Sequence, residues 1–137
     1  MTLEERKELA MSLHKKRYNC CQVVAMVFAD ELGVDGTDFF KLCEGFGTGM
    51  GGTMQSACGA LTAAAMIAGL KCSDGNLDAP ATKAQTAKVT REIMNEFKDK
   101  VGAILCKDIK GIETGNMLCS CNDAILAAVE IIDKILM

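Results

Sequence analysis

Residues 45–70 read GFGTGMGGTMQSACGALTAAAMIAGL, and this stretch contains no charged side chain. Its first part is a glycine-rich loop. Its second part, residues 56–70, would be apolar on nearly every side of a helix. A helix without a polar face is typical of the centre of a bundle. The stretch therefore predicts an all-α fold packed around a central apolar helix at residues 56–70.

The rest of the chain agrees with this fold class. The 137 residues suffice for one domain with a hydrophobic core, so we expect a single helical domain over residues 1–137. Proline occurs once, helix-forming residues are abundant, and no alternating strand pattern is present. The patterns predict a bundle of about five to seven helices. Besides the central one, they fall at about residues 3–16, 20–32, 37–44, 80–98, 103–111 and 121–136.

Helix-capping signals mark several of these starts. Thr2 with Glu5, and Asn19 with Gln22, have the spacing of a capping box. Ser120 is the expected cap of the last helix, and Ser56 that of the central helix. With Ser56 as the cap, the thiol of Cys58 would lie in the first turn of the central helix.

Charge and hydropathy exclude several function classes. The net charge is −3, and the basic residues are spread over both halves, which argues against nucleic acid as a partner. The chain does not open with the apolar segment of a signal peptide, and its longest strongly apolar run is short for a membrane span. We therefore expect a cytoplasmic protein without a membrane partner.

Eight cysteines are unusual for such a protein. Structural disulfides are disfavoured in the reducing cytoplasm, so this number indicates metal binding or redox chemistry. The alternative is that cysteines pack as small hydrophobic residues, which we expect for roughly half of them. Cys43 and Cys72 are expected to be structural in this sense.

Cysteines occur at three of the expected helix starts. The first has Cys20 and Cys21, the second has Cys58, and the third has Cys121. The positive end of a helix favours the thiolate, which attacks disulfides and binds metals. Cys106 is expected inside a helix, and Cys119 forms a C-x-C with Cys121. A single C-x-C is a weak metal signal, but iron–sulfur clusters need four thiolates rather than a fixed local spacing.

The glycine-rich loop has two interpretations, whereas the single histidine has one. Residues 47–52 match G-x-G-x-x-G, yet no strand precedes them. The glycines either allow close packing near Cys58 or offer backbone N–H groups to an anionic cofactor. The candidates for such binding are Gly49, Gly51, Gly52 and Gly59. His14 is expected to be a partly exposed helix residue without function.

Four segments together resemble the C_GCAxxG_C_C family of redox-active proteins, which has four characteristic cysteines. The segments are Asn19–Gln22, the glycine loop with Cys58–Ala63, the region around Cys106, and Cys121 with the residues after it. Ala63 replaces the last glycine of the family motif. The chain is also similar to the iron–sulfur domain of split-Soret cytochromes. The resemblance covers nearly the whole chain and implies redox activity at Cys20, Cys58, Cys106 and Cys121, with Cys21 and Cys119 as substitutes.

Two functions from different classes follow. The first is a small redox protein, an oxidoreductase of thiol or iron–sulfur type. In the thiol version the Cys58 thiolate attacks a disulfide and a second cysteine resolves it; in the other, the four thiolates bind an iron–sulfur cluster. Its partner would be a redox protein or a small thiol or disulfide. The second is a binding or assembly module, such as a homodimer, with structural zinc or cysteines that only pack.

Overall fold

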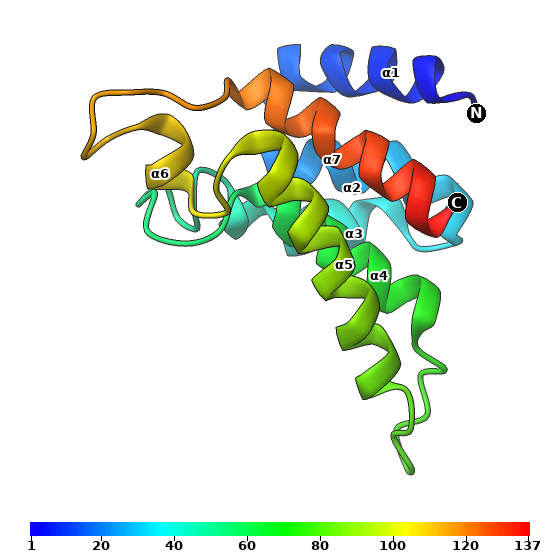
Figure 1. Ribbon diagram of the computed structural model, residues 1–137. Coiled ribbons are helices and arrows are strands. Elements are labelled where there is room, and N and C mark those ends of the chain that lie inside the picture. Colours follow the sequence, from blue (N-terminus) through cyan, green and yellow to red (C-terminus); the bar gives the residue numbers. More distant parts are fainter.

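The chain folds mainly into helices in the computed structural model, which describes residues 1–137. Seven α-helices and one short 3₁₀ helix confirm the all-α prediction (Figure 1). None of the helices is long and apolar enough to cross a membrane. The elements are α1 (Leu3–Lys15), α2 (Cys20–Leu32), α3 (Gly36–Cys43), η1 (Glu44–Phe46), α4 (Gly59–Cys72), α5 (Lys83–Val101), α6 (Cys106–Lys110) and α7 (Cys121–Leu136).

Two helices, α2 and α4, form the centre of the bundle. α4 packs against α2, α5 and α7, and α2 also contacts α1 and α3. The α4 alanines at positions 60, 63, 64 and 68 are fully buried. Since the distance between packed helices depends on the side chains at the contact, these short side chains let the neighbours approach closely. The predicted central apolar helix is therefore confirmed, with different bounds.

α4 begins at Gly59, and Ser56 is not its cap, so this part of the prediction is wrong. Residues 56–58 lie beside residues 104–106. The Cys58 N–H donates to the Ile104 carbonyl at 2.9 Å, and the Cys106 N–H donates to the Ser56 carbonyl at 3.0 Å. With Ser56 as the cap, its carbonyl would accept the first hydrogen bond of the helix, and its side chain would bond an early N–H group such as that of Cys58. Both groups are bonded to residues 104–106 instead. Cys58 is the N-cap residue of α4 instead of a residue of its first turn.

Two other helices also start later than predicted. α5 begins at Lys83 instead of Pro80. The segment before it forms a turn, in which the side chain of Asn76 accepts hydrogen bonds from the N–H groups of Asp78 and Ala79. Such side-chain bonds favour a turn over a helix. α6 starts at Cys106, because the residues before it pair with residues 56–58. The predicted caps of α1, α2 and α7 are confirmed.

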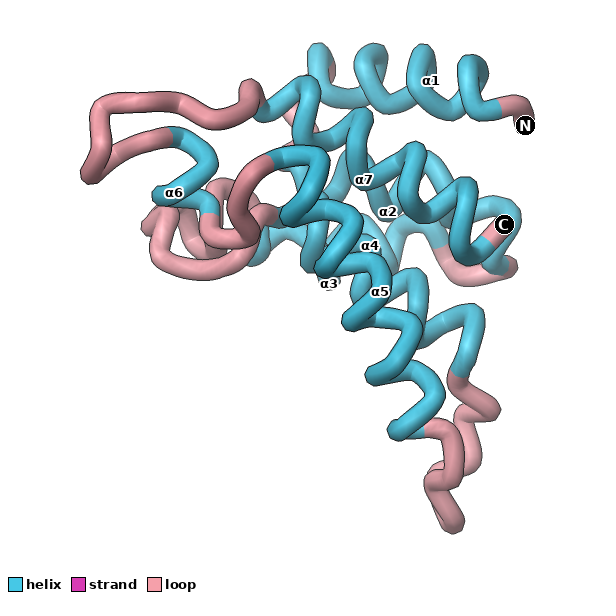
Figure 2. The backbone as a smooth tube through the Cα atoms, in the orientation of Figure 1, coloured by secondary structure: helices cyan, strands magenta, loops and turns pink.

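The glycine-rich loop and α6 lie together at one end of the bundle, where most of the non-helical segments gather (Figure 2). The Lys107 N–H donates to the Met54 carbonyl of the loop at 2.9 Å. Gly49 has a φ of +68°, and a Cβ atom there would lie 2.7 Å from the Cβ of Cys106. A side chain at Gly49 would therefore push Cys106 away. The loop acts as a packing element that holds Cys106 in place.

Arg6 fastens α1 to the rest of the bundle. Its buried guanidinium donates a hydrogen bond to Glu31 of α2 at 2.8 Å. Its Nε atom also forms an ion pair with Asp133 of α7, 2.9 Å from a carboxylate oxygen. It also lies 4.7 Å from the centre of the Phe28 ring, a cation–π distance. Because α1 carries His14, this contact fixes the position of that histidine as well.

Replacing Arg6 by methionine is expected to lower the free energy of unfolding by about 2 kcal/mol, because two carboxylates lose their cationic partner and the Phe28 ring loses its cation–π contact. The loss stays moderate since both carboxylates are partly exposed and remain hydrated. Urea unfolding measures it. The matched control is Lys7→Met on the same helix, whose ion pair with Glu130 is exposed and contributes less than about 1 kcal/mol. Equal losses in both variants would contradict this account.

Candidate functional site

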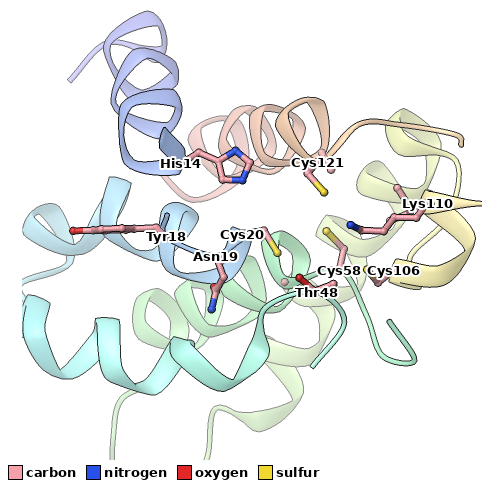
Figure 3. Close-up of a pocket in the computed structure, with 12 residues that line it drawn as sticks. His14, Tyr18, Asn19, Cys20, Thr48, Cys58, Cys106, Lys110 and Cys121 are labelled. Atoms are coloured by element: carbon pink, nitrogen blue, oxygen red, sulfur yellow. The ribbon is translucent and has the colours of Figure 1, made fainter. Parts of the chain in front are cut away.

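A cavity of about 250 Å³ lies where α1, α2, α4, α6 and α7 meet the glycine-rich loop (Figure 3). Four of the eight cysteines line it: Cys20, Cys58, Cys106 and Cys121. Figure 3 shows the sulfur atoms of Cys20, Cys58 and Cys121 pointing toward one shared space. These are the four cysteines that the sequence grouped into one site. Their assignment as catalytic or metal-binding residues stays a prediction.

Each of these cysteines stands at the start of a helix. Cys20, Cys106 and Cys121 are the first residues of α2, α6 and α7, and Cys58 is the N-cap of α4. The sequence predicted helix starts at Cys20, Cys58 and Cys121, but it predicted Cys106 inside a longer helix. Backbone N–H groups at a helix start have no partner within the helix and stabilise negative charge. The cavity is therefore suited to thiolates.

Cys20 and Cys58 form a hydrogen-bonded pair. The Cys58 thiol donates to the Cys20 sulfur, and this bond is the main reason why the pKa of Cys20 falls to about 6. The same bond is the main reason why the pKa of Cys58 rises, and burial raises it further. One proton is thus held on Cys58 while Cys20 is a thiolate near neutral pH. The sequence had suggested Cys58 as the thiolate.

Backbone N–H groups complete the surroundings of the Cys20 sulfur. Those of Thr48, Gly59 and Cys21 all act to lower its pKa, against the effect of burial. Gly59 is in close contact with this sulfur, since a Cβ atom there would lie 2.5 Å from it. A thiolate that accepts several hydrogen bonds is stabilised relative to the thiol. Thr48 and Gly59 therefore belong to the site although neither carries an ionisable group.

Cys106 and Cys121 complete the cysteine lining with different properties. Cys106 is buried, and burial raises its pKa, while the nearby ammonium group of Lys110 acts to lower it. A negative charge on Cys20 acts to raise it as well. Cys121 is the most open of the four and is exposed to solvent. The cavity thus combines buried thiols with an accessible one.

The other four cysteines lie outside the cavity. Cys21 and Cys43 are fully buried and hydrogen-bonded to each other, and the Cys43 thiol also donates to the sulfur of Met66 at 3.8 Å. Cys72 ends α4, far along the chain from the site, and Cys119 packs against the core. The cavity is therefore lined by Cys20 and not by Cys21, and by Cys121 and not by Cys119.

The glycines that were candidates for cofactor binding have different positions. Gly59 lines the cavity, and Gly49 packs against Cys106 behind it. Gly51 and Gly52 are exposed, and their N–H groups donate to carbonyl groups of the loop itself at 2.8 and 3.2 Å. Those two groups are already used and are not free for an anionic cofactor. Close packing, the other interpretation of the loop, accounts for Gly49 and Gly59.

Two polar residues of the cavity, His14 and Lys110, were not among the predicted site residues, and His14 is the partly exposed helix residue that was expected. The Nδ1 atom of His14 lies 2.6 Å from the side-chain oxygen of Asn122, so Nδ1 carries the proton in this hydrogen bond. Lys110 points into the cavity from α6 (Figure 3). His14 lies on a helix outside the four segments of the family resemblance, and Lys110 follows Cys106 on α6 without being one of the motif residues. Only the packing of α1 and α6 brings them there.

The donor type of the cavity is compatible with an iron–sulfur cluster. No three of the His, Cys, Asp and Glu side chains lie close enough together to hold one ion. Four thiols around a cavity are, in contrast, the donor set of clusters, which distribute their ligands over two or more irons. Cys20, Cys58, Cys106 and Cys121 would hold such a cluster.

The alkylation rate of Cys20 is expected to follow the ionisation of a group with a pKa of about 6. Iodoacetamide labelling across pH 4–9, followed by mass spectrometry of the Cys20 peptide, measures it. The Cys58→Ala variant loses the main stabilising hydrogen bond, so its midpoint is expected to move to higher pH. The same midpoint in both proteins would show that the thiol pair does not control Cys20.

The fold and the cavity define a class: an all-α protein whose helix starts bring four cysteines around one cavity. The chain belongs to the family described as “Putative redox-active protein (C_GCAxxG_C_C)”, whose model matches residues 18–135. The matched region contains all four cavity cysteines and leaves out α1 with His14. The resemblance found in the sequence is therefore confirmed. Neither curated proteins nor solved structures gave a match to this chain.

Proposed function

We propose that this protein is a thiol–disulfide redox protein in which Cys20 is the nucleophile and Cys58 the resolving cysteine. The observation that carries the proposal is the hydrogen-bonded Cys20–Cys58 pair at the cavity, with a thiolate on Cys20 and a proton on Cys58. Membership of a family described as redox-active supports it. The attacking thiol of disulfide exchange works best when its pKa is close to the ambient pH.

The reaction needs two successive exchanges. The Cys20 thiolate attacks one sulfur of a disulfide RSSR, forms a mixed disulfide with it and releases RS⁻. Cys58 then loses its proton to solvent and attacks the Cys20 sulfur, which releases the second RS⁻ and closes a Cys20–Cys58 disulfide. The two leaving thiolates take up protons according to their own pKa. Two electrons pass from the protein to the substrate, and a thiol reductant would restore the protein.

A second candidate is electron transfer by an iron–sulfur cluster on the same four cysteines. The observation in its favour is that Cys106 and Cys121 line the cavity as well, although a dithiol needs only two sulfurs. A bound cluster would supply single-electron transfer. Lys110 and the helix starts would offset the negative charge of its thiolate ligands.

The two candidates are separated by analysing anaerobically purified protein for iron, acid-labile sulfide and zinc. Colourless, metal-free protein is then mixed, in the reduced state, with one equivalent of glutathione disulfide. The dithiol proposal expects two glutathione thiols released per protein, and only one from Cys58→Ser. Iron with sulfide that is lost in cysteine variants would favour the cluster. Bound zinc, or no metal and no reaction, would favour the binding module.

A further inference from the structure

The geometry points to a small disulfide that carries a negative charge as the substrate of this cavity, with Lys110 as the residue that selects it. This inference rests on the proposed thiol–disulfide function and names its substrate class. Two independent observations support it: how deeply the reacting sulfurs lie, and which charge faces them.

The position of the sulfurs favours a small substrate over a protein. Of the two reacting cysteines, Cys20 is half-buried and Cys58 is 8% exposed, and the cavity in front of them measures about 250 Å³. A cavity of this size admits a small molecule or the end of one. The disulfide of a folded partner would have to leave its own surface to reach the Cys20–Cys58 pair. The substrate is therefore expected to enter the cavity.

The charge in the cavity favours an anion. Lys110 is the only Lys, Arg, Asp or Glu among the lining residues. Its ammonium group takes part in none of the salt bridges of the protein and extends toward Cys58 and Cys121 (Figure 3). A carboxylate on the substrate would pair with it, whereas an ammonium group would be repelled.

The starts of α2, α4 and α7 add to this preference, because the partial positive charge of each faces the same cavity. The Cys20 thiolate has the opposite effect. We therefore expect the carboxylate of the substrate to lie near Lys110 and its sulfur–sulfur bond to lie near Cys20. Lys110 thus determines specificity without taking part in the exchange of bonds.

Three small symmetric disulfides of different charge test the inference on reduced, metal-free protein. They are dithiodiglycolate, which is anionic, 2-hydroxyethyl disulfide, which is neutral, and cystamine, which is cationic. The rate of Cys20–Cys58 disulfide formation is measured with each and divided by the rate of the same disulfide with 2-mercaptoethanol. This division removes differences in intrinsic reactivity.

We expect the anionic disulfide to react at least about tenfold faster than the neutral one, and the cationic one to be slowest. Lys110→Gln should reduce the anionic preference to within about threefold. The matched control is Lys107→Gln on the same helix. Lys107 is paired with Glu113 and does not line the cavity, so the preference should remain.

Different failures have different meanings. A wild-type protein that forms the disulfide with all three probes at similar normalised rates would overturn the anionic preference and leave the thiol–disulfide function intact. A preference that persists in Lys110→Gln would overturn the role of Lys110. A protein that forms no Cys20–Cys58 disulfide with any probe would overturn the proposed function and the inference with it.

Discussion

The Gly59→Ala variant is expected to lose about 2 kcal/mol of unfolding free energy and to lose the low pKa of Cys20. The added methyl would lie 2.5 Å from the Cys20 sulfur and 3.0 Å from the backbone nitrogen of Cys21 and the carbonyl oxygen of Phe46. Since two of these three atoms belong to the backbone, the starts of α2 and α4 would have to move apart. That movement weakens the hydrogen bonds from Gly59 and Cys58 to the Cys20 sulfur. Urea unfolding and the pH dependence of alkylation measure the two effects.

Gly69→Ala is the matched control on the same helix. A Cβ atom there would meet nothing within 4 Å, and alanine favours a helix interior over glycine. This variant is expected to gain about 0.5–1 kcal/mol with the Cys20 pKa unchanged. A Gly59→Ala protein as stable as the Gly69→Ala protein would show that the contact between α2 and α4 at Cys20 is looser than described.

The second large effect is expected in Cys20→Ser, whose reaction with glutathione disulfide should be at least about 30-fold slower at pH 7. A thiol with a pKa of about 6 is about 90% ionised at this pH, whereas an unperturbed cysteine is about 3% ionised. Burial still raises the pKa of Cys58 and of Cys106, two of the three other cysteines that line the cavity, so neither replaces it. The initial rate of thiol release measures the loss.

Cys72→Ser serves as the control, because Cys72 is partly exposed but lies outside the cavity. Its rate is expected to stay within about twofold of the wild type. If Cys72→Ser lost as much activity as Cys20→Ser, or if Cys20→Ser reacted normally, another thiol would be the nucleophile.

Much of the fold could be predicted because its signals are local. The apolar run after Cys58 identified the central helix, and the capping residues Thr2, Asn19 and Ser120 marked three starts correctly. The start of α4 could not be predicted, because it depends on hydrogen bonds between residues 56–58 and 104–106, far away in the sequence. Ser56 has the right side chain for a cap, but its backbone is already paired.

The sequence could identify the cysteines of the site, but it could not predict which of them is the thiolate. The family resemblance selected the four cysteines that line the cavity. Which of them is the thiolate depends on hydrogen bonds to Cys20 from three separate segments, around Thr48, Cys58 and Cys21. His14 and Lys110 also required the packed structure, since neither belongs to a sequence motif. Helix starts indicate where thiolates are favoured, and tertiary contacts decide which sulfur becomes one.

Disulfide mapping tests the central claim most directly. Reduced, metal-free protein is oxidised with one equivalent of glutathione disulfide, the remaining thiols are blocked at low pH, and the linked peptides are identified by mass spectrometry. The Cys20–Cys58 pair predicts one intramolecular bond between these two residues, with Cys21 and Cys43 still reduced. A bond between Cys106 and Cys121, or a protein that retains all eight free thiols, would contradict it.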